Sequence, residues 1–365
     1  MRTVYMFLAF LLLVAFYLSL IAIIIGLGYL AIVVAMKGRI KAALALGFLD
    51  FILIVGLFAK ARPPLGLWKQ EHDLPALFQM VREVAAKTGT APADEVYISP
   101  DANIAVQQVG GVLGLPIGTK RVLRVGVGAL QAVTMDQFRA ILAHEMAHYQ
   151  KGDTAVGRFL ARVPLSIGTM LSGMRSGTGW WFINPVYWYL FLFAHGYMIV
   201  ISAMSRRQEF TADQIAAETY GSDVFSSALT NLVVDSTLFG AIIMPGAEKL
   251  MTEGQVLINA YETHREVRDK MPGEDRDRIL QELMAEKRGV FSSHPTLSER
   301  LEALKRYPPA GEGTRDERPA REIFTDPEAT EKELTEFLSA MIYHAQHAGE
   351  AAQPAEAAES AEAAE

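Results

Sequence analysis

Cysteine is absent from the 365 residues of this chain. No disulfide can therefore stabilise the fold, and no thiolate is available to bind a metal. Any metal site must be built from histidine, aspartate or glutamate side chains. An excess of basic residues is also lacking, because 34 lysines and arginines face 41 aspartates and glutamates. The sequence offers no basic surface for nucleic acid, so we expect no nucleic-acid partner.

Charged residues are missing from long stretches near the amino terminus. Residues 4–36 carry no charge, and residues 42–59 carry only Asp50. The first run exceeds the roughly 20 apolar residues that cross a bilayer, and the second comes close to that length. A cleavable signal peptide would have a shorter apolar run. We therefore predict that residues 1–62 form a transmembrane hairpin.

Acidic residues are missing between Thr154 and Gln208, where two further apolar segments lie at 159–174 and 180–204. The second segment is long enough to span a bilayer, whereas the length of the first is marginal. We predict a second membrane hairpin over residues 156–205. A pair of buried or interfacial helices that do not cross the bilayer is the alternative.

A hairpin returns the chain to the side on which it started, so the amino terminus and the soluble parts should share one compartment. Basic residues that flank the membrane segments are slightly more numerous on that side than in the turn at 37–41. The positive-inside rule therefore favours a main domain in the cytoplasm, attached to the cell inner membrane.

The remaining residues have the composition of a soluble α+β domain, so we predict a mostly α fold with a small β-sheet plus transmembrane helices. Short β-rich runs at 95–98, 104–107 and 122–127 indicate the sheet. Thr134 lies three residues before Gln137, a capping-box spacing that predicts the start of a helix. The expected parts are 63–155 and 206–312 for the two halves of the soluble domain, 313–348 for a C-terminal amphipathic helix, and 349–365 for a disordered acidic tail.

His144, Glu145 and His148 form an HExxH motif inside this helix. Residues four apart lie on one helical face, so both imidazoles can reach one ion while Glu145 reaches the attacking water. The alternative is a solvated helix face that carries two histidines by chance. Glu145 would take a proton from the water and pass it to the leaving amine.

A zinc protease needs a third protein ligand and an open fourth position. The metzincin pattern is excluded, because Lys151 and Thr154 occupy the positions where it requires glycine and histidine. The candidates that remain along the chain are Asp153, His195 and Glu209.

Three motifs and the apolar helices between the first two are similar to those of a known family. The motifs are AHEMAH at 143–148, SRRQEFTAD at 205–213 and SHPTLSERL at 293–301. They resemble the integral-membrane zinc endopeptidases that include the HtpX-like heat-shock proteases and the CAAX prenyl proteases. The resemblance covers roughly residues 70–305 and implies a zincin-like metalloprotease domain with Zn²⁺ as its cofactor.

The resemblance also implies roles for individual residues. Glu209 becomes the third zinc ligand beside His144 and His148. Asp213 follows Glu209 by four residues, and its carboxylate would support a ligand histidine. His294 would donate a hydrogen bond to the oxyanion that forms during hydrolysis.

A substrate-binding strand is implied as well. In the family this strand usually reads Asn-Ala-Phe-Ala, and the counterpart here begins at Asn103 and includes Ala105. Ile104 and Val106 depart from the usual residues. The specificity of the pocket is therefore not carried over from the family.

We expect a membrane-bound zinc endopeptidase that cleaves membrane or membrane-proximal proteins in protein quality control. Its expected partners are these protein substrates and the lipid bilayer. Prenyl-protein processing of the CAAX type is a second possibility, disfavoured because the related prenyl proteases have more spans than the four expected here. A non-catalytic zinc-binding membrane adaptor is a third, disfavoured by the intact Glu145.

Overall fold

The computed structural model describes residues 2–58, 62–110, 118–148, 163–177, 181–253, 255, 257–289, 292–311 and 313–347. The expected disordered tail at 349–365 lies outside these residues. The long helices are α1 (Arg2–Met36), α2 (Ile40–Leu57), α7 (Pro185–Tyr220), α8 (Ser222–Thr252) and α12 (Pro327–His347). The shorter helices are α3 (Pro75–Thr88), α4 (Met135–Ala147), α6 (Val163–Gly177), α9 (Ala260–Lys270), α10 (Gly273–Ala285) and α11 (Leu297–Leu304), and short 3-10 turns are η1 (Ala129–Gln131), η2 (Trp181–Ile183) and η3 (Ala320–Ile323). The strands are β1 (Leu67–Lys69), β2 (Glu95–Ser99), β3 (Ile104–Val109) and β4 (Lys120–Gly126). The expected class, mostly helical with a small sheet and membrane helices, is confirmed.

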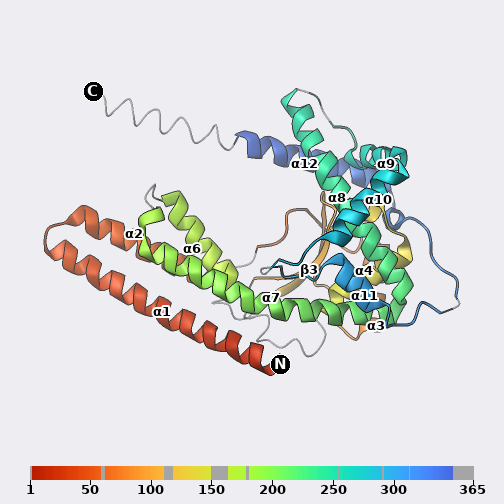
Figure 1. Cartoon of the computed structure of the whole chain (residues 1–365). Coiled ribbons are helices and arrows are strands. Elements are labelled where there is room, and N and C mark those ends of the chain that lie inside the picture. The colour runs from red at the N-terminus through yellow and green to blue at the C-terminus, as the bar shows by residue number, and fades with distance from the viewer. Residues whose placement is uncertain are drawn as a thin grey trace.

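Helices α1, α2, α6 and the first half of α7 form an elongated bundle that projects from the rest of the molecule (Figure 1). Their inward side chains make a hydrophobic core of their own, which includes Phe16, Leu53 and Tyr187. Large apolar side chains also cover the outside of the bundle, such as Ile25 at 67 % exposure. A helix bundle that is apolar inside and outside is typical of a membrane domain.

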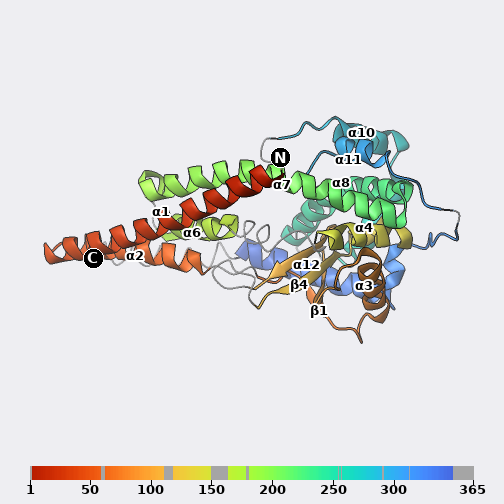
Figure 2. The ribbon, with the colours of Figure 1, turned by 90° about the horizontal axis from the view of Figure 1, so that it is seen from below.

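Helices α1 and α2 are antiparallel, and the amino terminus lies beside the soluble domain at the near end of the bundle (Figures 1 and 2). Within residues 1–62, where a transmembrane hairpin is predicted, the two described helices thus form a helical hairpin. Gly28 of α1 faces Asp50 of α2, since the Oδ2 atom of Asp50 lies 3.4 Å from the place that a Cβ would occupy at Gly28, an ordinary van der Waals distance. Asp50 therefore lies at the packing surface between the two helices.

Four of the described helices are long and apolar enough to cross a membrane, namely α1, α2, α7 and α8. Helix α6 is not among them, since its 15 residues reach only about 22 Å of the roughly 30 Å hydrocarbon core. Helix α8 was expected to be soluble, and its apolar residues are used in the core of the soluble domain, where Phe225, Ala228 and Phe239 are buried. The apolar length of α8 thus reflects domain packing.

The topology of the α6–α7 hairpin can be tested at Ser176, an exposed residue in the last turn of α6. If the hairpin crosses the bilayer, a cysteine at position 176 should react with an impermeant thiol reagent only from the side opposite the catalytic domain. Since the chain has no native cysteine, the labelling reports this position alone. Labelling from the catalytic side would show an interfacial hairpin instead.

The soluble domain contains one four-stranded sheet in the order β1-β2-β4-β3. β2 and β4 are parallel, while β1 and β3 run antiparallel to their neighbours. The three predicted strands are confirmed, and β1 was not predicted. Among the described strands, β3 pairs with β4 and lies at one end of the sheet.

Helix α4 packs in the main core of this domain, where Phe138 and Leu142 are fully buried. It begins as predicted, since Thr134 and Gln137 form a reciprocal capping box. α7 continues without a break from the membrane bundle into this core, where Ala216 and Ala217 are buried. One helix therefore connects the membrane directly with the domain.

The last helix, α12, begins at Pro327, within the residues 313–348 predicted for a C-terminal amphipathic helix, and the side chain of Asp326 accepts a hydrogen bond from the main-chain N–H of Ala329. Its apolar face is buried, as expected of an amphipathic helix. Glu331, fully buried, binds the guanidinium groups of Arg265 and Arg321. This ion pair attaches α12 to α9 and η3.

Candidate metal and catalytic site

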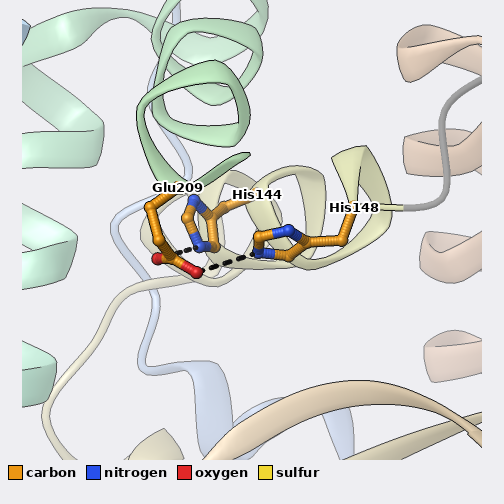
Figure 3. Close-up of side chains that lie close together, drawn as sticks. All are labelled: His144, His148 and Glu209. Carbon is orange, nitrogen blue, oxygen red and sulfur yellow. Dashed lines mark ion pairs between the residues drawn. The ribbon is translucent and has the colours of Figure 1, made fainter. Parts of the chain in front are cut away.

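Both histidines of the HExxH motif lie at the C-terminal end of α4 and point the same way (Figure 3). His144 is buried, while His148 remains partly exposed. Their rings are perpendicular, with centroids 5.0 Å apart. Helical periodicity thus produces the convergence that the spacing predicted.

Glu209 reaches the same point from α7, which crosses α4 (Figure 3). Its carboxylate oxygens lie 3.6 Å from Nε2 of His144 and 3.5 Å from Nε2 of His148. Such distances are too long for good hydrogen bonds. They match the roughly 3.4 Å that separates two ligands of a tetrahedral zinc ion with bonds of about 2.1 Å. The three side chains therefore fit one metal ion, and their ligand atoms all lie within 4.8 Å of one another.

Asp213 lies one turn beyond Glu209 and accepts a hydrogen bond from Nδ1 of His144 at 2.9 Å. This bond leaves Nε2 of His144 to face Glu209, as a metal ligand requires. Arg300 of α11 donates two hydrogen bonds to Asp213, at 2.9 and 2.6 Å. Arg300 also lies 3.5 Å from Nδ1 of His144. Since that nitrogen donates to Asp213 and cannot accept a second proton, we regard this contact as packing.

Charge around His144 favours its protonated form when no metal is bound. Burial lowers the pKa of His144, but the hydrogen bond to Asp213 and the nearby carboxylate of Glu209 outweigh burial and raise the pKa to about 9. A metal must displace this proton.

Zinc binding at pH 7 should therefore release protons, because the pKa of His144 lies near 9 in the metal-free protein and a bound metal requires a neutral imidazole. The affinity for zinc should fall as the pH is lowered below the pKa of His144. The number of protons released can be measured by calorimetric titration with zinc in buffers of different ionisation enthalpy, because the buffer takes up the protons and contributes its own heat. Asp213→Asn should reduce the number of protons released, because it weakens the hydrogen bond that raises the pKa of His144. A heat of binding independent of the buffer would contradict the prediction.

Glu145 follows His144 on α4 and is partly exposed. Its Oε2 accepts a hydrogen bond from the main-chain N–H of Val106 on β3 at 3.3 Å. Burial raises the pKa of Glu145, and the opposing effects of His144 and Val106 do not cancel this shift. A carboxylate of raised pKa is a better proton acceptor than a fully solvated one.

His294 also reaches the site, on the segment that precedes α11. Its Nδ1 lies 3.1 Å from Oε1 of Glu209, and this bond raises the pKa of His294. The side chain is 67 % exposed, so one face of the ring is open to solvent. The structure thus brings His294 beside the expected metal position.

The other candidate residues lie elsewhere or outside the described chain. His195 is exposed on α7, where its ring bonds the carbonyl oxygen of Phe191, about 21 Å from Glu209 along the helix. His344 and His347 are exposed on α12. Asp153 lies outside the described residues.

The substrate-strand residues are near the site but face the sheet. Asn103 immediately precedes β3, and its carbonyl oxygen accepts a hydrogen bond from the N–H of Gly126. Ala105 is two residues further along, so its main-chain groups point in the same direction as those of Asn103, and it pairs with Arg124 of β4. Their main-chain groups therefore point toward β4 rather than outward.

Sequence reasoning did not assign Arg300 or Phe225. Arg300 stands six residues after His294 in the third motif, and that spacing was its available signal. Phe225 of α8 stacks on the His144 ring at 5.5 Å between centroids. No local pattern marks Phe225, because an aromatic residue in an apolar helix is common.

This chain is similar in sequence to known peptidases. The model of peptidase family M48 matches residues 78–307. The chain is 24 % identical over 285 residues to protease HtpX homolog 2 of Methanosarcina mazei, covering 70 % of this chain and 83 % of that protein. It is 27 % identical over 292 residues to protease HtpX of Xylella fastidiosa, covering 74 % and 88 %. A crystal structure of Ste24p from S. mikatae aligns with a TM-score of 0.36 and 15 % identity, over 76 % of this chain and 64 % of that chain.

Proposed function

Because the chain belongs to peptidase family M48, we propose that it is a zinc-dependent endopeptidase that cleaves membrane or membrane-proximal proteins. The family and the apolar helices make it an integral-membrane metalloprotease. The choice of zinc, the residue roles and the substrates are parts of the proposal.

The observation that carries the proposal is the convergence of His144, His148 and Glu209 beside Glu145. Two neutral imidazoles and one carboxylate are a ligand set that zinc accepts in proteases. A zinc ion bound there would supply Lewis-acid activation of the scissile carbonyl and of the attacking water. Glu145 accepts the proton of that water and delivers it to the leaving amine.

The surrounding residues orient this machinery. Arg300 holds Asp213 through two hydrogen bonds, and Asp213 fixes the ring of His144. His294, with one face open, is placed to donate a hydrogen bond to the oxyanion once it turns from Glu209. Such donors act most strongly where water is excluded.

The continuity of α7 supports substrates at the membrane. The apolar part of this helix ends near Met204, so Glu209 follows about 8 Å further along the axis. A bilayer around the bundle would thus end close to the metal ligands. Removal of misfolded membrane proteins by a catalytic domain on the cytoplasmic side of the inner membrane agrees with this position.

Two other functions stay open to experiment. A prenyl-protein processing role would require a site enclosed by more spans than this bundle provides. A non-catalytic adaptor would bind zinc and cleave nothing.

The test uses the full chain in detergent or vesicles, loaded with zinc. We expect about one zinc per chain and cleavage of unfolded membrane proteins. Proteomic comparison of membranes that contain the active enzyme or its Glu145→Gln variant would identify the natural substrates. Zinc binding without any cleavage would support the adaptor, and cleavage confined to prenylated tails would support the processing role.

A further inference from the structure

The imidazole ring of His144 is held at its two nitrogen atoms. Nδ1 donates to Asp213 at 2.9 Å, and Nε2 faces Glu209 at 3.6 Å across the expected metal position. These contacts set the tautomer and the direction of Nε2, but they act at the edge of the ring. The torsion about the Cβ–Cγ bond of histidine has broad minima, so contacts at the edge restrain the tilt of the ring plane only weakly. A metal ligand needs that plane to be fixed, because the lone pair of Nε2 lies in it.

One face of the same ring is covered by Phe225. The two rings are stacked, with centroids 5.5 Å apart and planes inclined by 22° to one another. This separation lies within the range of roughly 4.5 to 7 Å over which aromatic pairs attract one another beyond the burial of their area. An imidazole that tilted toward α8 would lose the stacked arrangement. Phe225 therefore restrains the rotation that the contacts of the nitrogen atoms leave open.

Phe225 itself is fixed by its surroundings. It is 1 % exposed in the main core and lies in the first turn of α8. Gly221 separates α7 from α8, and its φ of 97° lies in the region that favours glycine. The start of α8 is held by Ser222, whose N–H bonds the carbonyl oxygen of Pro308 at 3.0 Å and whose hydroxyl bonds that of Tyr307 at 2.9 Å.

The segment that holds α8 directly follows the helix that carries Arg300. Tyr307 comes three residues after the end of α11, and Arg300 of α11 donates two hydrogen bonds to Asp213. The carboxylate at the edge of His144 and the aromatic ring on its face are thus both anchored to α11 and the turn after it. Ligands held by packed neighbours in this way bind a metal with a smaller loss of conformational freedom.

We propose that Phe225 is a positioning residue, whose ring holds the imidazole plane of His144 in the orientation in which Nε2 meets the metal. The inference rests on the proposed metal site. Many apolar side chains can fill a core, whereas a flat ring is needed to present a face to the imidazole. Phe225 acts through His144 and takes no part in proton transfer.

The experiment compares two phenylalanines of the same helix in the full-length protein. Phe225→Leu keeps an apolar side chain in the core and removes the flat ring beside His144. Phe239→Leu is the matched control, because Phe239 is also buried in the main core, at 2 % exposure, but stacks on Tyr261. Both changes remove the same atoms, and both should lower the temperature of thermal unfolding of the metal-free protein.

Zinc affinity and cobalt absorption separate positioning from core packing. In competition with a chelator, Phe225→Leu should bind zinc about 10-fold more weakly, as expected when a group that orients a ligand is lost. With Co²⁺ in place of zinc, its visible absorption should differ from that of the wild-type protein, because the bands report the geometry of the ligands. Phe239→Leu should match the wild-type protein in both measurements. Phe225→Tyr keeps the aromatic face and should keep the wild-type cobalt absorption.

Two results would overturn the inference. Wild-type zinc affinity and cobalt absorption in Phe225→Leu would mean that Phe225 only fills the core. Equal losses of zinc affinity in Phe225→Leu and Phe239→Leu would mean that both changes act through stability. If Phe225→Leu does not fold, Phe225→Met takes its place, because a flexible methionine fills irregular core space and has no flat ring. Failure of the wild-type protein to bind zinc would instead refute the proposed metal site.

Discussion

Glu145→Gln should bind zinc as the wild-type protein does and lose about 10²- to 10⁴-fold in the rate of peptide hydrolysis, the usual contribution of a general base. The amide leaves His144, His148 and Glu209 in place but cannot accept a proton from water. Its oxygen can still accept the hydrogen bond from Val106, so the contact with β3 is kept. The change therefore isolates proton transfer from metal binding and from folding.

Metal analysis and a casein cleavage assay measure the two outcomes. Glu282→Gln, on an exposed face of α10, is the matched control for the loss of one carboxylate. If Glu145→Gln retained more than a few per cent of the wild-type rate, a different residue would have to be the base.

Glu209→Ala should lose both zinc and activity, because it leaves two histidines as the only ligands among the described residues. Asp213→Ala should have a smaller effect, a loss of about 10- to 100-fold in metal affinity, since it removes the hydrogen bond that orients His144. Asp213→Ala also removes the nearer carboxylate beside Arg300 and leaves Glu209 at 3.8 Å, which adds to the cost.

Zinc retention during stepwise chelation orders the variants. We expect the wild-type protein to hold the metal longest, Asp213→Ala less long and Glu209→Ala least. Retention by Glu209→Ala equal to that of the wild type would exclude Glu209 as a ligand. Asp153 would then be the remaining candidate from the sequence, because His195 lies far along α7.

Much of the fold could be predicted because it depends on local patterns. The capping box at Thr134, the uncharged run of α1 and the β-rich runs of β2, β3 and β4 each lie within one continuous segment of the chain. The length of an apolar run, however, could not show whether a helix crosses the membrane or packs in the core of the soluble domain. α8 is as apolar as a membrane helix, yet its residues fill the core of the soluble domain.

The sequence alone determined that His144 and His148 would share one face of a helix, since four residues make about one turn. It also determined that the metal ligands had to be histidine or carboxylate, because there is no cysteine. It could not by itself choose the third ligand. Glu209 follows His148 by 61 residues, and only the packing of α7 across α4 brings them together.

The contacts of Arg300 with Asp213, of Phe225 with His144 and of Val106 with Glu145 were likewise decided by tertiary structure. Each joins elements that are remote in the chain, and the free energy that holds them comes from burial of the whole core rather than from the residues in contact. A local spacing can place two side chains on one helical face. Which remote group meets them depends on how the helices and the sheet pack.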